Sequence, residues 1–178
     1  MRKFASRIDK LHLKIIRKNV LSILKGIAYK YKRKRIHILD IAPQDHFKNK
    51  EIFKNLNYKS LDIDKKSNSD FKADITVNNK KIIKNNTFDI ILCTEVLEHT
   101  LNPFKAVKEI YRILKHKGTL HVTTPLNYRI HGPLPDCWRF TEYGLKYLFK
   151  DFKILKIKSF DSNRFLFPIQ YYLILKKY

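Results

Sequence analysis

The sequence predicts an α/β protein with a doubly wound, mostly parallel sheet, and three consecutive segments in the middle of the chain are the basis of this prediction. The first half of segment 88–99 is a continuous apolar run that ends abruptly on polar residues, which is typical of a strand buried on both faces. Asn102 and Pro103 then provide a cap and a first helical residue, and apolar residues recur at helical spacing until Gly118. A second apolar run follows at 119–124. Strand, helix and strand in this order indicate a parallel crossover.

Further strands and helices are predicted on both sides of this unit. Short apolar segments bounded by polar residues indicate strands, and apolar residues at helical spacing indicate helices. The segment 80–86 is expected to be a short helix or a loop, and Asp45 is expected to cap the helix that follows the first strand. Strands are predicted at 36–40, 57–62, 71–75, 152–160 and 165–175, and helices at 47–56 and 141–149.

Residues 1–35 are expected to form a basic helical extension ahead of a single domain over 36–178. Between residues 4 and 31 the apolar pattern is helical, but the apolar stripe moves around the helix near Asn19, which predicts one bent helix or two short ones. The favoured interpretation is a helix that covers the sheet. The alternative is a basic amphipathic helix that makes a peripheral contact with an anionic membrane through residues 1–30.

The composition predicts one globular, intracellular domain. The 178 residues include 44% hydrophobic and 13% aromatic side chains, which is enough for a core. No apolar run is long enough to span a bilayer, and Lys or Arg interrupts every apolar segment near the N-terminus, so a cytoplasmic protein is expected. Cys93 and Cys137 have neither metal nor redox spacing, and no metal site is predicted. The net charge of +22 favours an anionic substrate or partner, with nucleic acid possible but not favoured.

Short motifs accompany the central strand, helix and strand. They are Phe88-Asp89, Glu-Val-Leu-Glu-His at 95–99, Leu-Lys-His-Lys-Gly at 114–118 and Thr124-Pro125. In this order they resemble the fourth motif region of class I S-adenosylmethionine-dependent methyltransferases, especially the methyltransferase type 11 group. The segment 136–141, Asp-Cys-Trp-Arg-Phe-Thr, is similar to one that some members carry. The resemblance covers about residues 36–160 and implies a Rossmann-like methyltransferase fold, whose seven-stranded sheet ends in an antiparallel pair, here with an N-terminal helical extension.

The resemblance implies S-adenosylmethionine as the cofactor, held at the ends of the strands. In the family's first motif, three glycines after Leu-Asp let the backbone approach the cofactor, whereas here Ala42, Gln44 and His46 stand at the glycine positions. Asp62 ends the second predicted strand, where a carboxylate can accept hydrogen bonds from both ribose hydroxyls, although an Asp there also suits a turn. The cofactor-binding residues are predicted to be Asp40, Ala42, Gln44, Asp62, Asp74, Thr94 and Glu95.

The segment between residues 123 and 141 is predicted to be a long loop, and in the family this loop covers the acceptor site. Trp138, Arg139 and Arg129 are expected to contact the acceptor, because an indole ring stacks on sugars or bases and a guanidinium binds anions. The alternative for Trp138 and Phe140 is that the two rings pack the loop against the domain.

Methyl transfer to a small-molecule, sugar or lipid-linked glycan acceptor is the function that the sequence favours. In-line displacement from a sulfonium requires alignment and exclusion of water rather than a catalytic triad. A hydroxyl or amine acceptor must also lose a proton, and the candidate general bases are His131, Asp136 and His99. Two alternatives remain open. One is a cofactor-free binding module with this fold, which the missing glycines favour, and the other is a basic RNA-binding or RNA-methylating protein, for which the sequence has no recognised RNA module.

Overall fold

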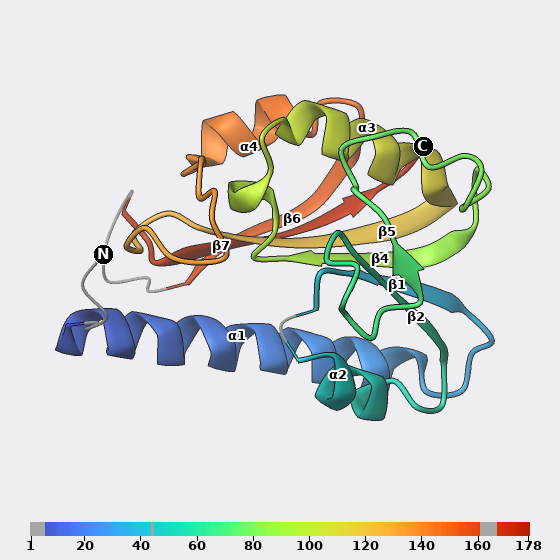
Figure 1. Cartoon of the computed structure of the whole chain (residues 1–178), viewed down its shortest axis with the longest axis horizontal. Helices are drawn as coiled ribbons and strands as arrows, with labels where there is room; N and C mark the ends of the chain where they lie inside the picture. The colour runs from blue at the N-terminus through green and yellow to red at the C-terminus, as the bar shows by residue number, and fades with distance from the viewer. Residues whose placement is uncertain (1–5, 44, 161–166) are drawn as a thin grey trace.

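The strands of the chain form one twisted sheet with helices on both faces (Figure 1). The computed structural model describes residues 6–43, 45–160 and 167–178, without the side chain of His46. Within these residues the sheet has seven strands in the order β3-β2-β1-β4-β5-β7-β6. The strands are β1 His37–Ile41, β2 Asn57–Asp62, β3 Phe71–Lys72, β4 Phe88–Thr94, β5 Leu114–Pro125, β6 Lys153–Phe160 and β7 Gln170–Lys176. All pairs are parallel except β5 with β7 and β6 with β7, which confirms the predicted fold class.

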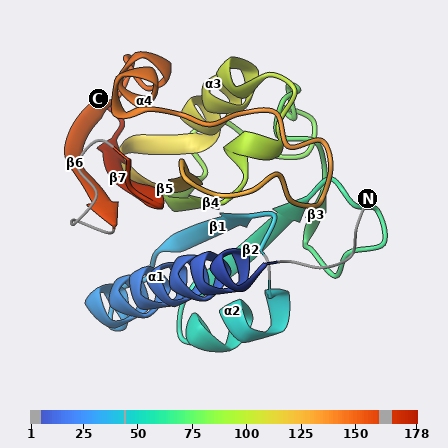
Figure 2. The same cartoon turned by 90° about the vertical axis from the view of Figure 1, so that its left-hand side faces the viewer.

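The helices divide between the two faces of the sheet. α1 Arg7–Tyr31 and α2 His46–Ile52 cover one face, while α3 Pro103–Ile113 and α4 Glu142–Leu148 cover the other, as the two views in Figures 1 and 2 agree. A short 3₁₀ helix, η1 Leu97–His99, follows β4. No helix in the described part of the chain combines the length and the hydropathy that crossing a lipid bilayer requires.

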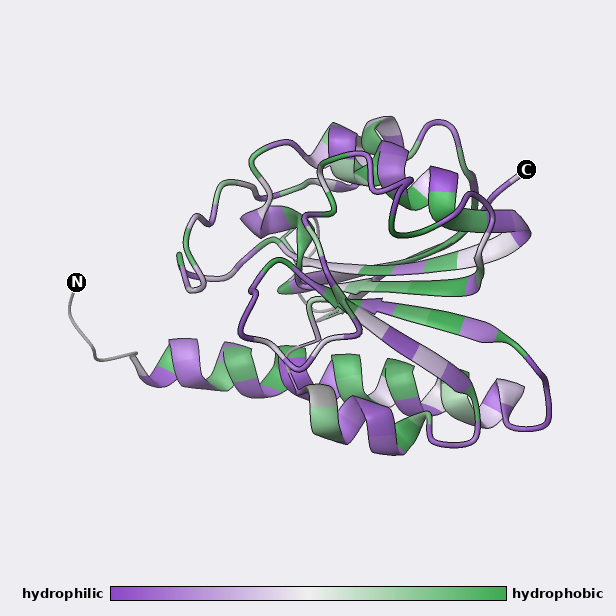
Figure 3. Ribbon diagram, turned by 45° about the vertical axis from the view of Figure 1, so that its right-hand side comes forward, coloured by the Kyte–Doolittle hydropathy of each residue, from purple (hydrophilic) through white to green (hydrophobic). Residues whose placement is uncertain are grey.

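The central strands are apolar on both sides because each face of the sheet has its own core. Ile38 and Ile90 pack with Leu24 and Ile27 of α1, whereas their neighbours Leu39 and Ile91 pack into the larger core under α3 and α4. This alternation follows from the two-residue period of a strand. Figure 3 shows the same arrangement, with hydrophobic residues concentrated in the strands and alternating with hydrophilic ones along α1.

α1 is one continuous helix through Asn19, so of the two predicted alternatives the pair of short helices is wrong. Ser6 and Asp9 form a reciprocal capping box at its start. Asn19 donates a side-chain hydrogen bond to Gln170 of β7 across 3.2 Å, which joins the middle of the helix to the sheet. The first apolar stripe remains largely outside the core, since Ile8 is 65% and Leu11 is 55% exposed. The division at residue 35 and the membrane contact stay predictions.

Tertiary pairing shortens several predicted elements. The helix that was expected to continue to Gly118 ends at Ile113, because Leu114 already pairs with Phe88 of β4. Lys177 stabilises this boundary by donating hydrogen bonds to the carbonyls of Tyr111 and Leu114. Three smaller differences are that α2 ends at Ile52, that β3 covers only Phe71–Lys72, and that 80–86 consists of turns and irregular backbone.

Candidate functional site

A cavity of about 710 Å³ lies where the strand order reverses, at the carboxyl ends of the central strands. β2 and β3 lie on one side of β1, and β4 and β5 lie on the other, and open α/β sheets bind ligands at such a switch point. Four predicted site residues that follow or end these strands line the cavity: Ala42, Asp62, Asp74 and Glu95.

The loop after β1 turns as a glycine-containing loop would, although it has no glycine. Ala42 has a φ of +47°, in the left-handed region that glycine adopts most readily. Its backbone N–H donates to the carbonyl of Leu61 across 2.7 Å, which fixes the bend against β2. Asp45 caps α2 by accepting a hydrogen bond from the N–H of Lys48 at 3.0 Å, as predicted. Gln44 lies outside the described residues.

Two carboxylates of the cavity wall are only partly used by the protein. One oxygen of Asp62 accepts the backbone N–H of Asp64 at 2.8 Å. One oxygen of Asp74 accepts the N–H and the hydroxyl of Thr76, at 2.7 Å and 2.8 Å. Within the described residues the second oxygen of each has no protein hydrogen-bond partner, so each side chain can still accept a hydrogen bond from a ligand.

Two glutamates at the end of β4 are buried in an acidic pair. Glu95 has a φ of +55° and accepts a hydrogen bond from the side chain of Gln170 at 2.8 Å, and burial raises its pKa to about 7. Glu98 is fully buried, and burial together with the charge of Glu95 raises its pKa well above the usual value. The sequence suggested only that Glu98 was a structural acid at a helix start.

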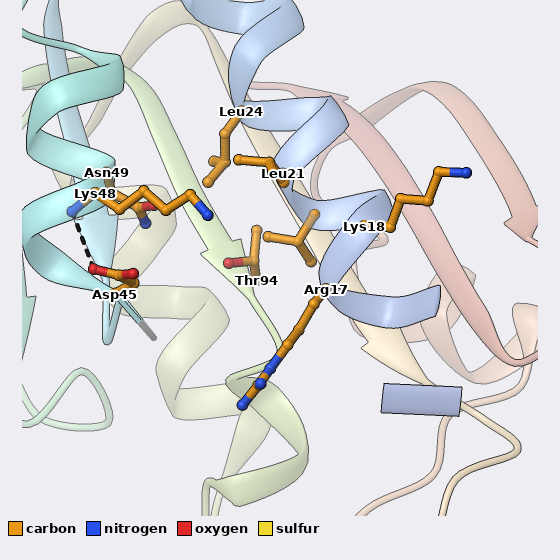
Figure 4. A pocket seen from close by; sticks show the side chains of 9 residues that line it. Arg17, Lys18, Leu21, Leu24, Asp45, Lys48, Asn49 and Thr94 are labelled. Atoms are coloured by element: carbon orange, nitrogen blue, oxygen red, sulfur yellow. Dashed lines mark hydrogen bonds between the residues drawn. The ribbon is translucent and has the colours of Figure 1, made fainter. Parts of the chain in front are cut away.

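Thr94 lines a second, smaller cavity of about 450 Å³ rather than the larger one. Figure 4 shows Thr94 at the end of β4, between Lys48 from α2 and Arg17 from α1. Arg17 lines both cavities, so the N-terminal helix contributes to the wall of the site. The sequence contained no sign of this, because the contact depends on how α1 lies across the sheet.

Asp40, which was predicted to lie beside the cofactor, does not line the larger cavity. Its carboxylate accepts hydrogen bonds from Asn49 and from the hydroxyl of Tyr58, each at 2.9 Å. The side chain follows the strand alternation onto the α2 face, the same face as Ile38. Burial raises the pKa of Asp40 to about 6. Asp40 therefore joins β1, β2 and α2.

Two of the three predicted bases, His99 and His131, line the cavity with their rings 4.7 Å apart. The third, Asp136, does not line the cavity. Its carboxylate receives two hydrogen bonds from Arg139 and one from the backbone N–H of His131. Burial raises the pKa of this carboxyl, but these contacts outweigh it and lower the pKa to about 2, so Asp136 is a weak base that supports the loop.

The three residues expected to bind the acceptor are occupied in holding the loop, and none of them lines the cavity. Arg139 also donates to backbone carbonyls of the loop, including that of Arg129 at 2.9 Å. Arg129 itself pairs with Asp9 of α1 at 3.3 Å. The indole N–H of Trp138 donates to the carbonyl of Thr100 at 2.8 Å. Its ring stacks on Phe140, as the packing alternative predicted.

Sequence comparison assigns a family to the part of the chain that builds this site. The family described as Methyltransferase domain matches residues 35–122. An uncharacterized protein from Methanocaldococcus jannaschii is 40% identical over 86 residues, which make up 46% of this chain and 32% of that relative. The chain therefore matches about a third of the length of this curated relative.

Solved structures share the fold along most of the chain. The PH0226 protein of Pyrococcus horikoshii has a TM-score of 0.63 with 16% identity, over 90% of this chain and 91% of that one. A SAM-dependent methyltransferase from Methanosarcina mazei has a TM-score of 0.62 with 15% identity, over 85% and 96%. A putative type 11 methyltransferase from Sulfolobus solfataricus has a TM-score of 0.59 with 20% identity, over 84% and 88%. Residues 35–122 are therefore a methyltransferase domain, and the chain has the fold of the class I S-adenosylmethionine-dependent methyltransferases.

Proposed function

We propose that this protein is an active S-adenosylmethionine-dependent methyltransferase that binds its cofactor in the larger cavity. The observation on which this proposal depends most is the backbone at Ala42, which keeps the left-handed bend of the first motif without its glycine. The bend leaves a cavity of about 710 Å³ at the switch point, within the usual range for small-molecule sites. Loss of the glycines has therefore not closed the site around the described residues.

The residues of this cavity fit the adenosine part of the cofactor. The remaining oxygen of Asp62 can accept from ribose hydroxyls, and that of Asp74 can accept from an adenine amino group. Apolar side chains line the same region, namely the exposed Ile63 and the buried Ile75 and Val96, and such surfaces suit a flat base. Arg17 adds a positive charge to the wall, and no described acid forms a salt bridge with it.

In this reaction the chain itself holds the methyl donor, excludes water and admits the acceptor. When bound, S-adenosylmethionine supplies a methyl group on a sulfonium, which transfers by in-line displacement. The strand-end residues hold the donor in place, and the loop after β5, fixed by Asp136 and Arg139, excludes water from one side of the cavity. His99 and His131 line the wall formed by η1 and this loop, so the acceptor is expected to enter beside them.

The acceptor that we propose is a small molecule, a sugar or a lipid-linked glycan. The cavity is bounded by the ends of β1, β2, β3 and β4, by η1, by the loop after β5 and by α1. No inserted substrate domain covers it in the described residues. Such a site is open to small and extended acceptors. The net charge of +22 favours an anionic acceptor.

Transfer of a labelled methyl group tests both parts of the proposal. Wild-type protein, Asp62→Ala and the surface control Asp151→Ala are incubated with methyl-labelled S-adenosylmethionine and, separately, with glycolipid, small-molecule and RNA fractions. We expect label in the glycolipid or small-molecule fraction with the wild type and with Asp151→Ala, and at least tenfold less with Asp62→Ala, because a hydrogen bond to a charged group contributes about 1.5–3 kcal/mol. Label in RNA alone would contradict the acceptor class, and equal labelling by Asp62→Ala would contradict the site.

A further inference from the structure

Three potential metal ligands meet beside the larger cavity, where His99 and His131 line the wall and Glu98 is buried next to them. Glu98 and His99 come from η1, and His131 comes from the loop after β5. One carboxylate oxygen of Glu98 and one ring nitrogen from each histidine all lie within 4.8 Å of one another. The two histidines also border the cavity, so this cluster faces the space in which the proposed reaction takes place.

The carboxylate of Glu98 has no partner that would compensate for its burial. The side chain is 0% exposed, and apart from its own backbone N–H neither oxygen has a hydrogen-bond partner within the described residues. A buried carboxylate without a partner is costly, and proteins usually pair such groups or use them to coordinate a metal. Its Oε1 lies 3.9 Å from Nε2 of His99, so it points toward the two imidazole rings.

The guanidinium of Arg139 is already paired with another acid. Arg139, whose charge acts on Glu98, forms its two-nitrogen contact with Asp136. Glu95 is a second buried acid near Glu98, and its side-chain hydrogen bonds come from neutral groups, the amide of Gln170 and the hydroxyl of Thr123. The two acids are thus buried near each other, and among the described side chains no Lys or Arg forms a salt bridge with either of them.

Both imidazoles are oriented as metal ligands usually are. Nδ1 of His99 lies 3.1 Å from the carbonyl of Pro135, and Nδ1 of His131 lies 3.2 Å from the carbonyl of Arg129. A carbonyl only accepts hydrogen bonds, so Nδ1 of each ring carries the proton and Nε2 keeps its lone pair. Metal-bound histidines are fixed in this way by a hydrogen bond from the other ring nitrogen.

We propose that Glu98, His99 and His131 bind a divalent first-row transition metal ion, with open coordination positions toward the cavity. Two imidazoles and one carboxylate favour ions such as Zn²⁺, Co²⁺ or Fe²⁺ over Mg²⁺ or Ca²⁺, which prefer oxygen ligands. Bonds of about 2.0–2.2 Å place neighbouring ligand atoms roughly 3–3.5 Å apart, so binding draws the three side chains slightly together.

An ion at this position would favour acceptors that have an oxygen atom able to bind the metal. Its open positions face the cavity, so an oxygen atom of the acceptor is the expected additional ligand. This consequence for the acceptor rests on the proposed methyl transfer, whereas metal binding itself does not. The two imidazoles then act as metal ligands rather than as general bases.

Metal binding can be measured without cofactor or acceptor. The full chain is freed of metal with a chelator and titrated with CoCl₂ and, separately, with ZnCl₂, and the heat and the visible absorption of Co²⁺ are recorded. We expect one ion per chain, and a tenfold or greater loss of affinity in each of Glu98→Gln, His99→Gln and His131→Gln. The control is His116→Gln, since His116 is an exposed histidine with its Nδ1 2.8 Å from the carbonyl of Tyr178 and should leave binding unchanged.

Each result either supports or overturns the proposal. Absence of a Co²⁺ absorption band and of heat at millimolar metal in the folded wild type would overturn it. Binding that is equally strong in the wild type and in all three ligand variants would overturn it as well, because the ion would then lie elsewhere. Thermal unfolding of each variant shows whether it remains folded, and the intensity of the wild-type Co²⁺ band distinguishes an ion held by a few protein ligands from the hydrated ion. Cofactor binding is measured separately, so failure of one proposal does not imply failure of the other.

Discussion

The carboxylate of Asp136 accepts hydrogen bonds from two nitrogens of Arg139, at 2.6 Å and 2.8 Å. The Asp136 side chain is completely buried and that of Arg139 is mostly buried, so this pair is shielded from water. The same carboxylate accepts the backbone N–H of His131 at 2.9 Å. One acid thus fixes both the loop after β5 and the position of a histidine in the cavity wall.

Replacing this acid should loosen the loop and lower stability. Asp136→Asn keeps the size of the side chain but removes the charge and one acceptor, so we expect the free energy of unfolding to fall by about 2 kcal/mol. Urea unfolding measures the change. Asp151→Asn, on an exposed acid outside the cavity, should change it by less than about 0.5 kcal/mol. Equal stability of the wild type and Asp136→Asn would mean that the pair does not hold the loop.

Because Ala42 has a left-handed backbone, replacing it with glycine should stabilise the protein. An alanine in this region is strained by roughly 1–2 kcal/mol, which exceeds the entropic cost of a glycine. We expect Ala42→Gly to raise the free energy of unfolding by about 0.5–1 kcal/mol. Ala28→Gly, in the last turn of α1, should lower it, by up to about 1 kcal/mol. A loss of stability in both variants would contradict the bend at Ala42.

Because His121 is buried in its neutral form, the free energy of unfolding should fall in mild acid. Its ring is buried in β5 next to the hydroxyl of Tyr172, and burial lowers its pKa to about 4 from the usual value of 6.5. A depressed pKa gives stability that is present above pH 6.5 and is lost as the pH falls toward 4, because only the unfolded chain takes up the proton. Between pH 7 and pH 5 the loss is about 2 kcal/mol.

The measurement is urea unfolding of the wild type and of His121→Gln at both pH values. His121→Gln removes the titrating ring, so its stability should change with pH by about 2 kcal/mol less than that of the wild type does. Other groups, including Asp40 with its raised pKa, contribute equally to both proteins and cancel in this comparison. Parallel pH profiles for the two proteins would show that His121 is not the responsible group.

The sequence predicted the sheet well because burial leaves a clear pattern in a central strand. The apolar run that starts at Phe88 marks β4, and the acids after successive strands mark the ends that build the cavity. It failed at Leu114, where helical periodicity continues but pairing with Phe88 starts a strand. Local pattern cannot reveal such pairing, since the partner lies 26 residues away in the chain, as the positions 88 and 114 show.

The site was predicted less completely, because side-chain direction depends on tertiary structure. Asp62 and Asp74 line the cavity as expected, but Asp40 lies on the α2 face through strand alternation. Arg17 lines the cavity only because α1 crosses the sheet beside it. The unpaired burial of Glu98 is likewise a property of the folded loop, and its position in the Glu-Val-Leu-Glu-His motif was the only signal in the sequence.

Isothermal titration of the wild type with S-adenosylhomocysteine, the demethylated cofactor, tests the central claim most directly. If the carboxyl edge of the sheet holds an adenosyl group, one ligand should bind per chain and raise the unfolding temperature, and Asp62→Ala should weaken binding at least tenfold. Absence of both heat and a thermal shift at millimolar ligand would contradict cofactor binding, and the protein would then be a binding module with a methyltransferase fold.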